Sequence, residues 1–194
     1  MDENMIRCVH VARMNTLSEH QRISLMQIPP WDMDENIIKF ALDLFPDGLS
    51  FFGWRYIEGI YRISNGDLTQ YDDFIYCLIE HDFEMVRRQR YPDAPSRLQS
   101  LFAVESIGDI LKTWRRIMTG DYVFFEIFSD EVYERDASYL KAYSIATEYK
   151  LTDETPGYDN ICRYWECERS PEPEIELLLP LSANIHTGIR LSIQ

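Results

Sequence analysis

The stretch SLFAVESIGDILKTWRR, residues 100–116, changes its hydrophobic pattern at Ser106. Residues 101–104 form a continuous apolar run with the length of a buried strand. After this run, apolar residues recur at every third or fourth position. Ser106 with Asp109 three residues later resembles a capping box, the pattern that begins many helices. The stretch therefore predicts a short buried strand that leads directly into an amphipathic helix.

The sequence on either side predicts further strands and helices, and therefore an α+β protein with a single domain over residues 1–194. We expect the central strands to form a split or strongly bent mixed β-sheet that is flanked by helices. The expected strands lie around residues 6–12, 100–104, 122–128 and 174–179, and the expected helices around residues 35–45, 72–90 and 106–118.

Three segments between these elements carry more specific expectations. In the helix expected over 72–90, Phe74, Leu78, His81 and Met85 recur at spacings of three and four. Residues 152–173 contain three prolines and predict a loop. The aromatic run over residues 51–56 is expected to lie on a strand and to pack in the core. The alternative for this run is an aromatic face that stacks on nicotinamide or adenine.

Composition limits the classes of function. The 194 residues include 33 acidic and 19 basic side chains, which give a net charge of −14. This charge disfavours binding to nucleic acid and favours a protein or small-molecule partner. The chain has no long apolar run and no signal-peptide pattern, so we expect a soluble, cytoplasmic protein without membrane contact. The oligomeric state is left open.

The cysteines and glycines supply no familiar cofactor motif. Cys8 and Cys77 are isolated, and Cys162 with Cys167 forms only half of a possible zinc site. We therefore expect small apolar fillers and no metal. The chain has neither a GxGxxG loop nor a Walker loop, so a Rossmann-type or P-loop nucleotide site is not expected.

The order of several motifs resembles the ADP-ribosyltransferase-like superfamily. These motifs are His10 on a first short strand, SLFAVES followed by IGDILKTW, the strand DYVFFEI and the late EIELLLPLSANI. The phrases LFPDGLSFFGWRY, YPDAPSRLQSLFA and DNICRYWE resemble an uncharacterised bacterial or phage family that is associated with this superfamily. The resemblance implies a mono-ADP-ribosyltransferase that cleaves NAD, its substrate, and transfers ADP-ribose to a macromolecular acceptor. A protein acceptor is favoured over nucleic acid, in a toxin or counter-defence role.

Glu176 is the catalytic residue that the resemblance implies, with Glu174 beside it. Cleavage of NAD passes through a transition state with positive charge on the ribose, which a carboxylate stabilises. Residues 174 and 176 of a strand share a face, so both carboxylates project together while Ile175 points into the core. The alternative is that both glutamates are simply solvated at the start of a strand.

The resemblance also implies three residues that bind NAD. His10 would contact a ribose hydroxyl, although a histidine in an apolar strand is more often a hydrogen-bonded core residue. Arg97 would bind the pyrophosphate, with the Ser96 hydroxyl as a further donor. The alternative for Arg97 is a surface ion pair with Asp93 or Glu105.

A different class of function also fits the composition. A compact acidic protein can bind a basic surface of a host protein and inhibit it without catalysis, as phage or mobile-element counter-defence proteins do. The acidic residues here are scattered among apolar ones, which weakens this alternative.

Overall fold

The computed structural model describes residues 5–13, 17–64, 71–113, 120–142 and 157–193. It is an α+β protein in which the chain forms two compact units. The first, which we call the sheet unit, combines residues 1–24, 101–138 and 169–194. The second, which we call the helical unit, combines residues 25–100 and 139–168. Each unit therefore gathers segments that are far apart in the sequence.

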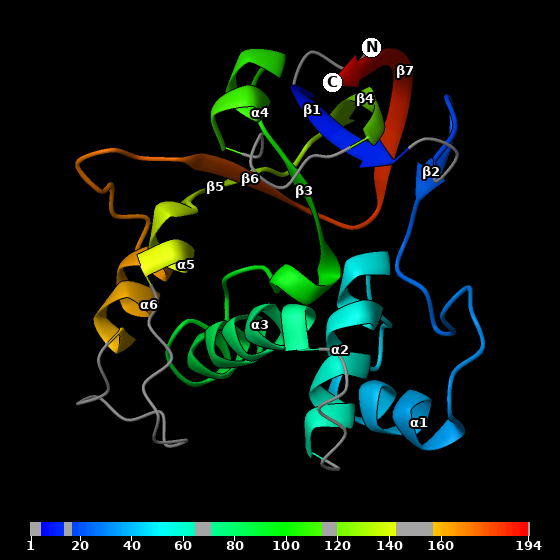
Figure 1. The fold of residues 1–194 in the computed structure, drawn as a ribbon, viewed down its shortest axis with the longest axis vertical. Coiled ribbons are helices and arrows are strands. Elements are labelled where there is room, and N and C mark those ends of the chain that lie inside the picture. The colour runs from blue at the N-terminus through cyan, green and yellow to red at the C-terminus, as the bar shows by residue number, and fades with distance from the viewer. Residues whose placement is uncertain (1–4, 14–16, 65–70, 114–119, 143–156, 194) are drawn as a thin grey trace. The chain divides into compact units, whose positions relative to one another are not determined.

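The sheet unit contains two small antiparallel sheets (Figure 1). The four-stranded sheet has the order β1-β4-β7-β2, with bounds Ile6–Arg13, Gly120–Ser129, Ala183–Ile193 and Arg22–Ile23. The three-stranded sheet has the order β3-β6-β5, with bounds Ser100–Ala103, Ile175–Pro180 and Tyr133–Asp136. The strands predicted around residues 6, 100, 122 and 174 are all confirmed, whereas the predicted mixed pairing is wrong because the sheets are antiparallel.

The two sheets meet where β3 ends. Val104 pairs with Val9 of β1 through two backbone hydrogen bonds of 2.8 and 2.9 Å. β3 therefore lies beside β6 within its own sheet, and its continuation lies beside β1 of the other sheet. The strands of this α+β unit are therefore divided between two small sheets that a backbone bridge connects.

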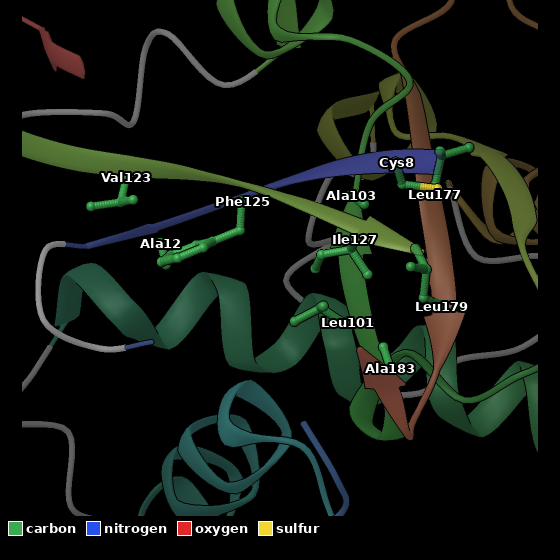
Figure 2. Close-up of a cluster of buried hydrophobic side chains, with 10 residues drawn as sticks. All are labelled: Cys8, Ala12, Leu101, Ala103, Val123, Phe125, Ile127, Leu177, Leu179 and Ala183. Carbon is green, nitrogen blue, oxygen red and sulfur yellow. The ribbon is translucent and has the colours of Figure 1, made fainter. Parts of the chain in front are cut away.

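A buried cluster of side chains from both sheets forms the main core of the sheet unit (Figure 2). Its members alternate along β1, β3, β4 and β6, as expected for the inward face of strands. They are Cys8, Ala12, Leu101, Ala103, Val123, Phe125, Ile127, Leu177, Leu179 and Ala183. We call this cluster the intersheet core.

Helix α4, Ile107–Thr113, covers the opposite face of β1 and β4. Ile110 packs there with Val104, Tyr122 and Phe124. The predicted cap is confirmed, because the Ser106 hydroxyl oxygen accepts the Asp109 backbone N–H at 3.4 Å, and the hydroxyl also donates to the Asp109 carboxylate at 2.6 Å. Residues 114–118 of the predicted helix lie outside the described residues.

The helical unit packs α1, α2 and α3 around its own core, and α6 packs against α3 through Phe83 and Tyr164 (Figure 1). These helices span Glu35–Leu44, Phe51–Ser64, Tyr71–Arg90 and Tyr158–Trp165, and a short 3₁₀ helix, η1, spans Arg97–Gln99. A fifth α-helix, α5, spans Ser138–Ala142. Ser50 caps α2, since its hydroxyl accepts the Gly53 backbone N–H at 3.0 Å.

Two sequence predictions for this unit are wrong. The aromatic run over residues 51–56 lies on helix α2 and not on a strand. Residues 158–165 form α6 within the predicted loop. The helix predicted over residues 72–90 is confirmed as α3, on which Met85 is exposed while Glu80, Phe83 and Glu84 are buried. The side chain of Phe74 lies outside the described residues. Among the described helices, none is long and apolar enough to cross a membrane.

Candidate functional site

Glu176 is a buried carboxylate in the sheet unit. It lies on β6 between Ile175 and Leu177, which both pack against the intersheet core. Strand alternation therefore turns Glu176 to the other face of β6, where it is only 4% exposed. The alternative of a solvated glutamate is thus wrong for Glu176. Glu174 comes just before the strand and is half-buried.

His10 lies at the junction of the two sheets. Its Nδ1 is 2.6 Å from the carbonyl oxygen of Phe102 on β3, and the residue is 3% exposed. Burial lowers the pKa of the His10 imidazole to about 4, although the hydrogen bond to Phe102 acts in the opposite direction. At neutral pH the ring is therefore neutral. Nδ1 carries the proton, because a carbonyl only accepts, and Nε2 is left as an acceptor.

This hydrogen bond gives a physical reason for the split in the sheet. Carbonyls two residues apart on a strand point the same way, so the carbonyls of Phe102 and Val104 both face β1. Val104 pairs with the backbone of β1. Phe102 instead accepts a hydrogen bond from the His10 side chain. The backbone ladder therefore opens at the point where the imidazole enters it.

The segment over residues 100–104 lies between the strands of His10 and Glu176. β6 pairs with β3 in the three-stranded sheet, and β1 pairs with Val104, the residue that follows β3. The side chains do not share one face, however. His10 follows the alternation of Cys8 and Ala12, which face the intersheet core, whereas Glu176 faces away from that core.

Arg97 and Ser96 belong to a buried polar network in the helical unit. The Arg97 guanidinium donates from Nε and Nη2 to the two oxygens of Glu80, each at 2.8 Å, and from Nη1 to the Tyr164 hydroxyl. Arg97 is 5% exposed. The ion pair of Arg97 is thus a buried one with Glu80, and not the predicted surface pair with Asp93 or Glu105. The donors that were expected to bind pyrophosphate are engaged inside the unit.

Ser96 and a second buried glutamate complete this network. The Ser96 hydroxyl donates to Glu84 at 2.9 Å and also accepts the Leu98 backbone N–H at 3.2 Å, which caps η1. Glu84 further binds Arg87 at 2.9 and 3.0 Å and Arg88 at 2.8 Å. Sequence analysis missed Glu80 and Glu84. Their spacing of four residues on one helix face is the signal that would have grouped them.

A third buried carboxylate, Asp136, ties β5 to the segment before β6. It accepts backbone N–H groups from Ser138, Ser170 and Glu174 at 3.0, 2.7 and 3.0 Å. Burial by itself raises the pKa of the Asp136 carboxyl, but hydrogen bonds from Ser170, Ser138 and Glu174 outweigh it and lower the pKa. Asp136 therefore fixes the backbone that leads into the strand of Glu176.

Residues 55–190 match a protein family described as "Protein of unknown function (DUF2441)". The chain belongs to the DUF2441 family. No curated protein matches this chain. The matched region contains Ser96, Arg97, Glu174 and Glu176, and it begins after His10.

A surface pocket of about 260 Å³ lies in the sheet unit of this DUF2441 protein. The described residues that line it are Glu105, Asp109, Glu134, Arg169, Pro173 and Ile175. Arg169 forms an ion pair with Glu134 at its rim. Pockets for drug-sized ligands measure about 300–1,000 Å³, so this pocket is small for a dinucleotide. None of its described lining residues is a predicted site residue.

Metal ligands do not gather in the part of the chain that the structure describes. No group of three or more His, Cys, Asp or Glu side chains there is placed to hold an ion. Cys162 and Cys167, the half-site in the sequence, are thiols outside any disulfide, on and just after α6.

Proposed function

We propose that this DUF2441 protein is a mono-ADP-ribosyltransferase with an ADP-ribosyltransferase-like sheet unit. The observation that carries the proposal is the position of β3, which lies between the strand of His10 and the strand of Glu176. Two residues that are 166 positions apart in the sequence thereby come to strands that flank the same segment of one unit. The motif order supports the same reading.

In this proposal, the Glu176 carboxylate stabilises the positive charge that develops on the ribose of NAD in the transition state. Glu174, half-buried and before the strand, is the carboxylate that faces the acceptor. The neutral His10 presents Nε2 as an acceptor for a ribose hydroxyl. Because Arg97 and Ser96 are engaged in the helical unit, their contact with the pyrophosphate is the weakest part of the predicted NAD site. The acceptor we propose is a protein of the cytoplasm.

The test is incubation of the full chain with labelled NAD and host lysate, with label followed in protein, nucleic acid and free ADP-ribose. Glu176→Gln should lower turnover by about two to three orders of magnitude, because a preorganised electrostatic contact acts mainly in the transition state. NAD binding by calorimetry should persist, since the amide keeps the size of the side chain. The matched control is Glu172→Gln, which alters an exposed glutamate before the same strand.

A second candidate is a non-catalytic acidic protein that binds and inhibits a host protein. Two observations favour it: His10 follows the core-facing residues of β1 whereas Glu176 faces away from the intersheet core, and both are almost fully buried. A parent protein that neither binds nor consumes NAD would support this second function. Folded Glu176→Gln protein that turns over NAD like the parent would exclude the catalytic role of Glu176.

A further inference from the structure

Arg135 of β5 and Glu176 of β6 stand opposite each other in the three-stranded sheet. They are register partners on antiparallel strands, so their side chains point to the same face with Cβ atoms about 4.5–5.5 Å apart. Arg135 is 5% exposed and Glu176 is 4% exposed. Arginine and glutamate are almost never buried to this extent unless they are paired. The strand register and the burial of both side chains therefore indicate that Arg135 and Glu176 pair.

We propose that Arg135 is the positioning residue for Glu176. Its guanidinium lies opposite the Glu176 carboxylate and fixes the direction of its oxygens. An arginine and a carboxylate frequently pair through two parallel N–H···O bonds, which set geometry as well as energy. A carboxylate that is held in one direction is preorganised to stabilise positive charge on a ribose.

Few other titratable groups of the described residues share the face of Arg135 and Glu176. Strand alternation places Tyr133 of β5 and Glu174, just before β6, on the same face, and these are the other titratable groups there among the described residues. Tyr133 lies under the guanidinium, with its ring centroid 5.8 Å from Arg135 Cζ. Within this set, Arg135 is the one cation. The assignment of a positioning role rests on the proposed function, whereas the pairing itself does not.

The first experiment measures the pairing without any catalytic assay. Urea unfolding of the full chain is followed for Arg135→Met, Glu176→Gln and the double variant. Each single variant leaves one buried charge without its partner, so the double variant should lose less stability than the two single losses added together. The matched control is the same cycle on Arg169 and Glu134, an ion pair of the same unit whose side chains are 44% and 49% exposed. That control cycle should be additive.

The second experiment measures the positioning role in NAD turnover. Arg135→Met should lower kcat at neutral pH by about 10²-fold or more. The KM for NAD should change little, because the residue acts on the orientation of Glu176 in the transition state. Arg135→Lys keeps a positive charge and should recover part of the lost kcat. A variant that is merely less well folded would lose rate in proportion to its unfolded fraction, which the urea experiment measures.

The outcomes separate this inference from the proposed function. Additive losses in the Arg135 and Glu176 cycle would overturn the pairing, whatever the activity. Coupled losses in stability with an unchanged kcat for Arg135→Met would overturn the positioning role in an active enzyme. A parent chain that consumes no NAD would overturn the proposed function, and with it the catalytic role, while the cycle still decides the pairing.

Discussion

Arg97 and Glu80 form a buried two-point ion pair that joins η1 to α3 inside the helical unit. Both oxygens of Glu80 accept from the guanidinium at 2.8 Å, and the two side chains are 6% and 7% exposed. The remaining guanidinium nitrogen, Nη1, donates to the Tyr164 hydroxyl of α6. One arginine therefore links three helical elements.

We expect Arg97→Met to destabilise the protein by about 3–5 kcal/mol, because it leaves the Glu80 carboxylate buried without its cation. Urea unfolding measures the loss. Arg62→Met is the control, since Arg62 pairs with Glu58 on α2 with a side chain that is 54% exposed, and it should cost less than about 1 kcal/mol. A stable Arg97→Met protein with weakened NAD affinity would instead restore the predicted contact of Arg97 with the pyrophosphate.

Arg97 illustrates which features the sequence can predict: local apolar patterns are predictable, whereas the partners of buried polar groups are not. The strand and helix over residues 100–113 were predictable because both patterns are local and apolar. The partner of Arg97 lies 17 residues away on a helix face that mixes glutamates with apolar residues, so hydropathy hides it. The bond between His10 and Phe102 joins residues 92 positions apart and depends on sheet order. Helix α2 was missed because its aromatic run has strand composition.

The buried His10 predicts a specific pH dependence of stability. Its pKa in the folded protein is about 4, below the ordinary value of 6.5 that the unfolded chain shows. A lowered histidine pKa means that unfolding is favoured by protonation, so this contribution is complete above pH 6.5 and is lost as the pH falls towards 4. The shift corresponds to about 3 kcal/mol. Urea unfolding between pH 4 and 8 measures it.

His10→Asn is the matching variant, because its amide nitrogen can still donate to the Phe102 carbonyl but does not titrate. It should remove most of the stability loss between pH 6.5 and 4. His81→Asn changes a half-exposed histidine on α3 and should leave the loss in place. If His10→Asn and the parent have parallel pH curves, the imidazole is not the neutral, buried group described above.

Gly53 marks a close approach between α2 and η1. A Cβ at this position would lie 2.0 Å from the Leu98 carbonyl oxygen, so backbone would have to move. We expect Gly53→Ala to cost about 1–3 kcal/mol or more, as overpacking does. Gly108→Ala on α4 is the control, since its Cβ would meet Ser106 at an ordinary 3.5 Å. It should be neutral or stabilise by about 0.5–1 kcal/mol. Equal melting temperatures for the two variants would contradict the close approach.

The hydrogen bonds of the Asp136 carboxylate to the segment before β6 should weaken in acid. Asp136→Asn replaces one of two accepting oxygens with an NH₂ group, which faces a backbone donor from Ser138, Ser170 or Glu174 and leaves it unsatisfied. The loss should be about 1–3 kcal/mol at neutral pH. Because the folded pKa of Asp136 is lowered, the advantage of the parent is present above the unfolded value of about 3.9 and disappears as the pH falls through the folded pKa.

Urea unfolding of the parent and Asp136→Asn from pH 7 to pH 2 tests this connection directly. The two stabilities should converge in acid, because protonation of the parent carboxyl removes an accepting oxygen just as the amide does. The control is Glu134→Gln, which changes a half-exposed residue of the same strand. Its stability should follow that of the parent over the whole pH range. A difference between parent and Asp136→Asn that stays constant down to pH 2 would mean that Asp136 acts through packing, and that backbone hydrogen bonds to its carboxylate do not hold the segment before Glu176.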